Sequence, residues 1–332
     1  MPARDDALRD VGRGLAAVPG TATTATTTTT TDCDLARWHR DRVHTPGGCD
    51  GRLRLTDDMP NRSPGRPGWS VRCAAHGDVP PLDLLVSVVV PTYNEARNLP
   101  AVLLQIPAAG TEVLVVDGHS RDDTVAVARE LCPDAVIVKQ PGRGKGDALR
   151  AGFQVARGDV VVMLDADGSM SPREIPAFVA ALVAGADLAK GSRALSGGGS
   201  ADLTFLRRTG NWGLGLLFNL IHGTRHTDLC YGYMAFWRRA LPAIMPDCDG
   251  FEVETLLNVR AAQAGLRVVE VPSNEGRRAY GDSNLHPVRD GLRVLGTLVR
   301  ELRLSLRQRR AAADAAATAG MTPTAAPAGQ AA

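Results

Sequence analysis

The sequence lacks the features that mark a secreted, membrane-spanning or zinc-ribbon protein. Its 332 residues include six cysteines, but none stands in a Cys-x-x-Cys pair. Scattered single cysteines argue against a zinc ribbon and predict a reduced, cytoplasmic chain. No apolar run reaches the roughly 18 residues of a membrane-spanning helix. The N-terminus carries Asp5, Asp6 and Asp10 and has no apolar segment of the kind found in a signal peptide.

The chain also has almost no excess of charge of one sign, since its formal net charge is +2. A nearly neutral chain has no general attraction to nucleic acid. Residues 1–83 are poor in apolar side chains and include a threonine-rich run at 21–31, so we predict a disordered, low-complexity region. Residues 311–332 are mainly Ala, Thr, Pro and Gly and are predicted to be a disordered tail. One catalytic domain is expected between them, at 84–310.

Within residues 84–310, short apolar runs alternate with segments that have helical spacing. The runs predicted to be strands are 85–90, 113–116, 135–138, 160–164, 187–191 and 267–271. Strands that alternate with helices predict an α/β fold with a doubly wound, mostly parallel sheet and helices on both faces. Ligands bind such sheets at the carboxyl ends of the strands.

The most informative stretch is the apolar run 160–164, which ends in Asp165 and Asp167. Two aspartates two residues apart would repel each other unless a cation lay between them. Their hard oxygen ligands favour Mg²⁺ or Mn²⁺, especially beside a diphosphate that supplies further oxygens. A polar turn that caps the next helix accounts for Ser171 and Glu174, but not for the two aspartates.

Polar side chains follow three further predicted strands. Tyr93 and Glu95 come after the first strand, Asp117 ends the second, and a glycine-rich turn with Lys145 follows the third. Because the carboxyl ends of parallel strands meet at one edge of the sheet, these residues and the two aspartates are predicted to form one site.

Eight motifs follow one another along the chain: 88–95 (VVVPTYNE), 115–124 (VVDGHSRDDT), 144–148 (GKGDA), 165–167 (DAD), 191–193 (GSR), 227–233 (TDLCYGY), 251–254 (FEVE) and 278–285 (RAYGDSNL). In this order they resemble the motifs of the family 2 glycosyltransferases with the GT-A fold, and within that family those of the dolichol- or polyprenyl-phosphate sugar synthases. The resemblance runs from about residue 84 to about residue 303.

The resemblance implies a role for each matching residue. Pro91, Tyr93 and Glu95 would line the nucleoside pocket, and Asp117 would contact the base or the ribose. Asp165 and Asp167 would bind the donor diphosphate and the metal, with Lys145 also on the donor side. Arg193 and Arg278 would face phosphates of the donor or acceptor, since a planar guanidinium suits bidentate contact.

The sequence departs from the family pattern at several positions. Gly118 stands where relatives usually carry a second aspartate, and Ser283-Asn284 stands where they often have Ser-Lys. Ser169 stands where some relatives place a metal-ligating glutamine. The Gln-x-x-Arg-Trp motif of processive polysaccharide synthases is absent after Glu254.

The function that follows is metal-dependent, inverting transfer of a sugar from a donor of the GDP-mannose or UDP-glucose type to a polyprenyl-phosphate-like acceptor. A soluble hydroxyl acceptor stays open as an alternative, and it would require a general base such as Asp249, Glu252 or Glu254. A sugar nucleotidyltransferase is disfavoured because the loop 91–95 has no glycine. A non-catalytic nucleotide-sugar-binding protein is disfavoured by the intact Asp165 and Asp167.

A last helix is expected from about residue 287, with an apolar stripe and an arginine-rich flank. Such a helix suits either peripheral contact with the inner face of a membrane or a solvated basic face packed on the domain. The helix expected at 203–221, with Trp212, leaves the same choice between a core helix and one that faces the acceptor or a membrane.

Overall fold

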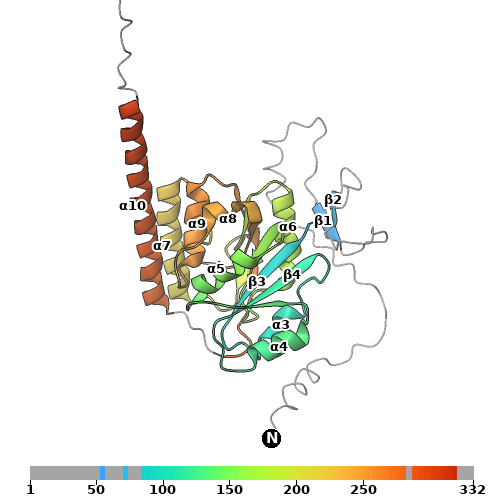
Figure 1. Ribbon diagram of the computed structural model, residues 1–332. Coiled ribbons are helices and arrows are strands. Elements are labelled where there is room, and N and C mark those ends of the chain that lie inside the picture. The colour runs from blue at the N-terminus through green and yellow to red at the C-terminus, as the bar shows by residue number, and fades with distance from the viewer. Residues whose placement is uncertain (1–52, 57–69, 74–83, 282–285, 320–332) are drawn as a thin grey trace, which may run out of the picture.

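The computed structural model describes residues 53–56, 70–73, 84–281 and 286–319 (Figure 1). Its centre is a seven-stranded sheet with the strand order β10-β7-β9-β6-β3-β4-β5. These strands are β3 (Val86–Thr92), β4 (Thr111–Asp117), β5 (Val136–Lys139), β6 (Val160–Met163), β7 (Leu188–Ser192), β9 (Met234–Trp237) and β10 (Val268–Pro272). The pairs β3–β4, β3–β6, β4–β5 and β7–β10 are parallel, which confirms the predicted mostly parallel sheet.

Helices cover both faces of this sheet because its central strands are apolar on both faces. One core contains Val88 and Val90 of β3 together with α3 (Leu99–Leu103), α4 (Thr124–Leu131) and α6 (Ile175–Val183). The other contains Val89 of β3 together with α5 (Lys145–Val155), α8 (Leu241–Ile244) and α9 (Val253–Gln263). Alternate residues of β3 thus enter opposite layers, as the pleat of a strand requires.

A third layer lies outside α9. It consists of α7 (Phe205–His222) and α10 (Pro287–Ala319), which stand side by side at the left of Figure 1. A small apolar core holds them: Phe218 of α7, Val259 of α9 and Leu298 of α10 are buried together with Leu229. Among the described residues, no helix is both long enough and apolar enough to span a membrane.

Three elements differ from the sequence-based expectations. β9 was not predicted, and it pairs antiparallel with β6 and β7. Residues 53–56 and 70–73, placed in the disordered region, form the antiparallel strands β1 (Leu53–Thr56) and β2 (Ser70–Cys73). The glycine-serine run at 196–200, expected to be a flexible linker, ends in β8 (Gly199–Ser200), which pairs with β11 (Asn274–Glu275). The rest of 1–83 lies outside the described residues.

The domain end predicted at residue 310 is also wrong, because α10 continues to Ala319. The alanine-rich sequence of 311–319 was read as low complexity, but alanine is the residue with the highest helix propensity and extends a helix that has already started. Residues 320–332 lie outside the described part of the chain.

Candidate active site

Six of the predicted site residues form two ion-paired triads at the carboxyl ends of the parallel strands. In one triad, Lys145 lies between Asp165 and Glu254. In the other, Arg278 lies between Glu95 and Asp167. Asp165 and Asp167 stand on the same loop after β6, so the two triads adjoin each other. The predicted convergence of these residues is therefore present in the structure.

In the lysine triad, the side chains of Lys145 and Glu254 are buried, and that of Asp165 is 28% exposed. Lys145 Nζ is 2.5 Å from Asp165 Oδ1 and 2.6 Å from Glu254 Oε1. Burial raises the pKa of Asp165 and of Glu254, although Lys145 opposes the change. Burial alone would lower the pKa of Lys145, but the two carboxylates together raise it above its usual value. The lysine therefore stays charged, while one ammonium is shared by two carboxylates.

The local fold brings Lys145 to this position. Lys145 opens α5 after Gly144, whose φ of 90° is a left-handed conformation that favours glycine. The backbone N–H of Gly146 donates to the carbonyl of Asp249 at 2.9 Å, and a Cβ at residue 146 would lie 2.2 Å from the carbonyl oxygen of Cys248. Only glycine allows this close approach, which docks the start of α5 against the loop before α9.

The arginine triad has a more exposed cation, since the Arg278 side chain is 22% exposed and that of Lys145 is 9% exposed. Arg278 Nη1 is 3.1 Å from Glu95 Oε1, and Nη2 is 3.5 Å from Asp167 Oδ2. Burial raises the pKa of Glu95, although hydrogen bonding by Asn98 and the charge of Arg278 oppose the change. The other oxygen of Asp167 accepts from the backbone N–H and the hydroxyl of Ser169, at 2.9 and 2.6 Å. Ser169 thus orients the aspartate.

The loops after β3 and β4 hold each other in place beside these triads. Asp117, the last residue of β4, is buried and accepts from the N–H of Ser120 at 3.1 Å. Asn94, in the left-handed region with φ of 56°, donates its N–H to Ser120 Oγ at 3.0 Å and accepts from the N–H of Arg121 at 2.8 Å. Tyr93 keeps 48% of its surface exposed, so its ring is free to contact a ligand.

An aspartate at residue 118, the residue usual in relatives, would be tightly packed. A Cβ there would lie 3.0 Å from the carbonyl oxygen of Thr92 and 3.2 Å from Gln140 Oε1. Pro91 and Thr92 pair in register with Val116 and Asp117, so the two strand ends are level. Pro91, Tyr93 and Asp117 therefore share one end of the sheet, and their contacts with a nucleoside stay predictions.

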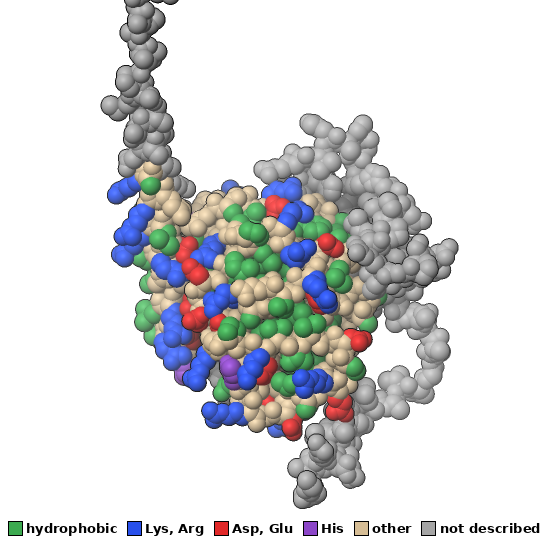
Figure 2. All heavy atoms as spheres, viewed as in Figure 1, with side chains coloured by type: hydrophobic (Ala, Val, Ile, Leu, Met, Phe, Trp, Pro, Cys, Tyr) green, Lys and Arg blue, Asp and Glu red, His purple; other side chains and the backbone are tan. Residues whose placement is uncertain are grey.

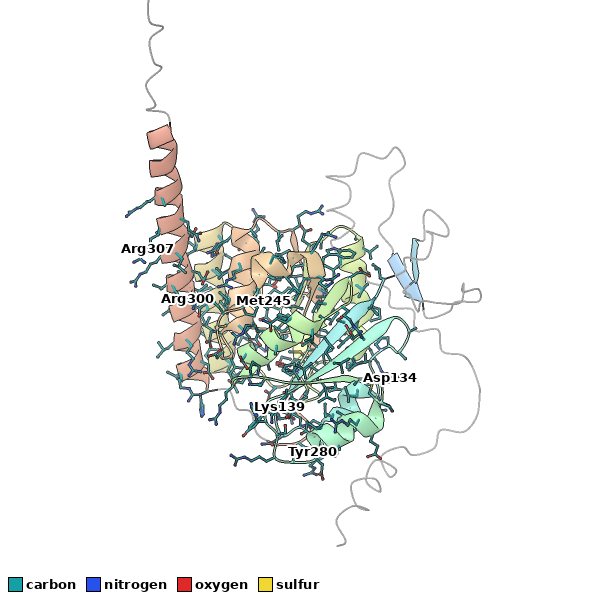
Figure 3. All side chains as sticks on the ribbon, viewed as in Figure 1. Asp134, Lys139, Met245, Tyr280, Arg300 and Arg307 are labelled. Carbon is teal, nitrogen blue, oxygen red and sulfur yellow. The ribbon has the colours of Figure 1, made fainter. Side chains whose placement is uncertain are left out.

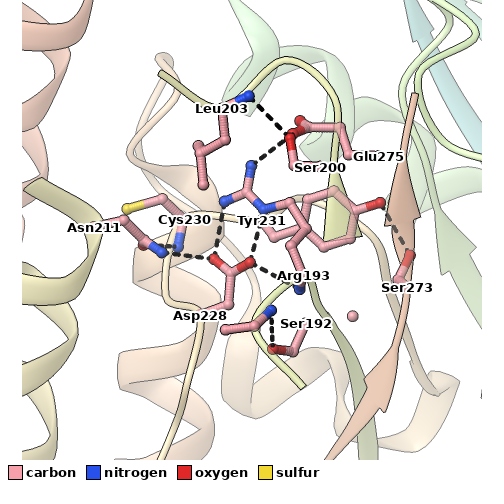
Figure 4. A network of polar contacts seen from close by, with 12 residues as sticks. Ser192, Arg193, Ser200, Leu203, Asn211, Asp228, Cys230, Tyr231, Ser273 and Glu275 are labelled. Carbon is pink, nitrogen blue, oxygen red and sulfur yellow. Dashed lines mark hydrogen bonds and ion pairs between the residues drawn. The ribbon is translucent and has the colours of Figure 1, made fainter. Parts of the chain in front are cut away.

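Arg193 lies in a separate, closed network (Figure 4). Its Nε and Nη2 donate to the two oxygens of Asp228 at 2.7 and 2.9 Å, and Nη1 donates to Glu275 at 3.1 Å. Its guanidinium also stacks on the ring of Tyr231, 4.7 Å from the centroid. All three guanidinium nitrogens are thus engaged by the protein, and the phosphate contact expected of Arg193 stays a prediction.

Several residues of the site were missed in the sequence. Asn98 donates to Glu95 at 2.6 Å and is joined by two hydrogen bonds to the backbone of Tyr280, so it connects β3 to the loop of Arg278. Gly232 packs on the lysine triad, since a Cβ there would lie 2.6 Å from Glu254 Oε1. Asp228 and Glu275 hold Arg193. The spacing of Asn98 from Glu95, one helical turn, was the one local signal available.

The residues at the strand ends fit a divalent cation. Asp165 and Asp167 offer carboxylate oxygens, which are the ligands that Mg²⁺ and Mn²⁺ prefer. The two triads contain four carboxylates and two cations, so the cluster keeps two negative charges in formal terms. Among the described residues there is no group of three or more His, Cys, Asp or Glu side chains able to hold a metal by itself. A cation here would need further oxygens from a ligand.

The sheet, its two helical layers and the paired aspartates after β6 define a GT-A glycosyltransferase. The family model described as "Glycosyl transferase family 2" matches residues 87–244. The chain belongs to this family, and it is therefore a glycosyltransferase.

Two relatives and one solved structure illustrate the similarity. The chain is 37% identical to polyprenol monophosphomannose synthase of Mycolicibacterium smegmatis, over 60% of this chain and 80% of the relative. It is 34% identical to undecaprenyl-phosphate mannosyltransferase of Micrococcus luteus, over 60% of this chain and 87% of the relative. Glucosyl-3-phosphoglycerate synthase of Mycobacterium tuberculosis, solved with Mn²⁺, uridine diphosphate and glucosyl-3-phosphoglycerate, matches with a TM-score of 0.53 and 25% identity, over 66% of this chain and 80% of that one.

Proposed function

We propose that the chain transfers a sugar from a nucleotide sugar to a polyprenyl-phosphate-like acceptor, with inversion at the sugar carbon and with Mg²⁺ or Mn²⁺ bound at Asp165 and Asp167. The observation that carries the proposal is the pair of adjoining triads, in which both aspartates are occupied by cations of the chain itself. The relatives named for polyprenyl- or undecaprenyl-phosphate mannosyl transfer support this class of acceptor.

The charges explain how the site would receive the donor. A diphosphate brings oxygen ligands for a divalent cation and also anions for Lys145 and Arg278. Asp165 and Asp167 would hold the cation beside the donor diphosphate, and Lys145 and Arg278, released from these aspartates, would contact the diphosphate oxygens. The bound metal supplies charge stabilisation to the leaving diphosphate. Lys145 and Arg278 add preorganised positive charge at the same oxygens.

The acceptor phosphate needs no general base. A phosphate monoester has a second pKa of about 6, so near neutral pH it is mostly a dianion. One of its oxygens attacks the anomeric carbon of the sugar and forms the new C–O bond. The bond from that carbon to the donor diphosphate breaks, and its electron pair leaves on the diphosphate. No proton has to move, so Glu254 can act as the partner that positions Lys145.

A second candidate is transfer to a hydroxyl of a soluble phosphate-bearing acceptor. It is supported by the structural similarity to glucosyl-3-phosphoglycerate synthase, whose structure contains glucosyl-3-phosphoglycerate. A hydroxyl has to lose its proton, so this route needs a base. Glu254 is bound to Lys145, and Asp249 is mostly exposed and paired with Arg150 at 3.3 Å. Glu252 has one buried carboxylate oxygen without a hydrogen-bond partner among the described residues, so it is the free candidate.

A donor panel tests the proposal. Purified protein is incubated with radiolabelled GDP-mannose, UDP-glucose or related donors, Mg²⁺ or Mn²⁺, and either polyprenyl phosphate or 3-phosphoglycerate. The expected result is label in the lipid extract that depends on polyprenyl phosphate and is abolished by EDTA. Label only in a water-soluble product, lost in Glu252→Gln, would instead support the second candidate. Absence of transfer from every donor, or transfer undiminished by EDTA, would contradict the proposal.

A further inference from the structure

The outer layer formed by α7 and α10 exposes apolar side chains on the faces that point away from the domain. On α7 the stripe is Phe205, Trp212, Leu216 and Leu220, spaced so that all four fall on one helical face. Phe205 and Leu220 are 85% and 81% exposed, and Trp212 is 66% exposed. The opposite face carries Phe218, which is buried in the core shared with α9 and α10. The stripe is therefore not the side that holds α7 to the protein.

A second stripe runs along α10. Its members are exposed and recur at helical spacing: Val288, Leu292, Leu295, Val299 and Leu306. Another face of α10 carries the buried residues Val294 and Leu298. A shallow groove of about 590 Å³ follows the helix between Leu292 and Arg307. Two neighbouring helices packed on one core thus both turn an apolar face outward, and an exposed apolar surface of this extent marks an interaction site.

The exposed charged side chains that α7 and α10 themselves contribute, where the structure describes them, are arginines, while Asp202 and Asp247 of neighbouring segments pair with Arg207 and Arg300. Exposed arginines line one side of the α10 stripe, at positions 289, 293, 300, 303, 307 and 310. Figure 2 shows Lys and Arg side chains gathered over α10 at the left edge of the molecule, and in Figure 3 Arg307 projects away from the domain. The acids of α10 whose side chains the structure describes, Asp290 and Glu301, are both buried. The sequence of α7 contains no acid and has Arg207 and Arg208 in its first turn.

We propose that α7 and α10 together form a docking surface for an anionic lipid membrane. An aromatic and aliphatic stripe beside a row of arginines is the pattern of a helix that lies in the headgroup region of such a membrane. The same two helices of a second copy would present arginines and no exposed acid from their described parts, so a symmetric contact between these surfaces would set like charges against each other. An anionic lipid surface matches both the apolar stripes and the arginine row.

This surface lies outside the ion-paired triads, yet the fold connects the two. Asn211 of α7 donates to Asp228 at 2.9 Å, and Asp228 holds Arg193. Glu275, the other partner of Arg193, lies on β11, which pairs with β8 just before α7 begins. A membrane bound at α7 would therefore contact the helix that holds the Arg193 network.

The test is cosedimentation with vesicles of phosphatidylcholine, with and without phosphatidylglycerol, at low salt and without donor or acceptor. Wild-type protein is expected to bind only the anionic vesicles, and added salt should release it because exposed charges are screened. Replacing Arg303 and Arg307 by Gln should lower the partition coefficient about 30-fold, equivalent to about 1 kcal/mol for each arginine near an anionic surface. Replacing Trp212, Leu216 and Leu220 by Gln should also lower it, by at least about tenfold.

Matched controls keep the result specific. Leu104→Gln with Val155→Gln removes exposed apolar side chains elsewhere, and Arg129→Gln with Arg173→Gln removes exposed charge elsewhere. Both control pairs should bind vesicles like the wild type. The thermal unfolding of each variant is also measured. An unfolding transition at the wild-type temperature shows that a change in vesicle binding does not come from misfolding.

Two results would overturn the proposal. One is equal binding of wild type and both surface variants to anionic vesicles. The other is a wild-type dimer in light scattering that the stripe variants dissociate, which would assign the surface to a second copy. The docking surface and the proposed reaction can be tested independently, because transfer to a short, water-soluble acceptor phosphate should be unchanged in the surface variants. Vesicle binding as expected, without transfer from any donor, would support the docking surface and contradict the proposed reaction.

Discussion

Arg193 and Arg278, for which the sequence predicts the same role, lie in different environments in the structure. The Arg193 side chain is 5% exposed, and three of its nitrogens donate to Asp228 and Glu275 at 2.7–3.1 Å. The Arg278 side chain is 22% exposed and touches Glu95 and Asp167 at 3.1 and 3.5 Å. Leaving the first network would strand buried carboxylates, which is costly. Leaving the second costs less, because Arg278 and Asp167 are more exposed and their contact is longer, so Arg278 can exchange partners during donor binding while Arg193 holds the loops together.

The comparison extends to the protonation of the carboxylates. Burial alone would raise the pKa of Asp228, but Arg193 and Lys190 hold it below its usual value. Burial raises the pKa of Glu95, Asp165 and Glu254 above theirs, against the opposing charge of Arg278 or Lys145. The network of Arg193 is therefore electrostatically satisfied. The two triads carry excess negative charge, which is the condition that favours an incoming cation.

The largest effect is expected from removing the buried arginine. Arg193→Gln should lower the free energy of unfolding by about 3–5 kcal/mol, because Asp228 and Glu275 lose their partner in a buried setting. Arg278→Gln should lower it by less, because Arg278 and Asp167 are more exposed, but should reduce sugar transfer. Urea unfolding and transfer assays on both variants measure the contrast. Equal destabilisation by the two substitutions would remove the distinction between the networks.

The next effect concerns the aspartates of the two triads. Asp167→Ala should lower metal-dependent transfer at least as much as the roughly 10–100-fold seen when residues that orient metal ligands are removed. Its stability should stay close to that of the wild type, since Asp167 is paired only at 3.5 Å. Asp134→Ala, at an exposed aspartate before β5, is the control and should transfer normally. Normal turnover by Asp167→Ala would show that the loop after β6 is not the metal site.

A smaller effect is expected in the pH dependence of stability. The folded-state pKa of Glu95 is above 4.5, so its contribution to stability is fully present below 4.5 and is lost as pH rises through the folded-state value. The folded-state pKa of Asp228 is below 3.8, so its contribution is already complete above 3.8 and is lost as pH falls through the folded-state value. Between pH 4.5 and neutrality, the stability difference between wild type and Glu95→Gln should therefore change.

Asp228→Asn is the matched control variant for the same pH range. Its stability difference from the wild type should be nearly constant from pH 4.5 to neutrality, because Asp228 is ionised throughout in both states. Urea unfolding at several pH values measures both differences. A constant difference for Glu95→Gln, or a pH-dependent one for Asp228→Asn, would show that the charge balance of the two networks has been assigned the wrong way round.

The sequence predicted the sheet and the site edge because both depend on local patterns. The apolar runs that became β3, β4, β6 and β7 are bounded by polar residues, and the strand order of an α/β fold brings their ends together. β9 was not predicted from the sequence, because it is four residues long and directly follows a family motif. Its antiparallel pairing between β6 and β7 comes from the fold rather than from any feature of its own sequence.

The partners of the site residues could not be predicted in the same way. Asp228 and Glu275 lie 35 and 82 residues after Arg193, and Glu254 lies 109 residues after Lys145. Residues this far apart in the sequence have no local spacing from which their contacts could be predicted. The resemblance gave Arg193 and Arg278 the same expected role, and only the burial and the partners of each guanidinium separate them.

A titration of Mn²⁺ binding, followed by electron paramagnetic resonance with and without a nucleoside diphosphate, tests the exchange of cations most directly. Mn²⁺ alone should bind weakly, because Lys145 and Arg278 already occupy the aspartates. The nucleotide should tighten Mn²⁺ binding by a factor in the usual range of coupling, about 5–150-fold, and Mn²⁺ should tighten nucleotide binding equally. Asp167→Ala should lose this coupling. Mn²⁺ affinity that is the same with and without nucleotide, or the same in Asp167→Ala, would contradict the account.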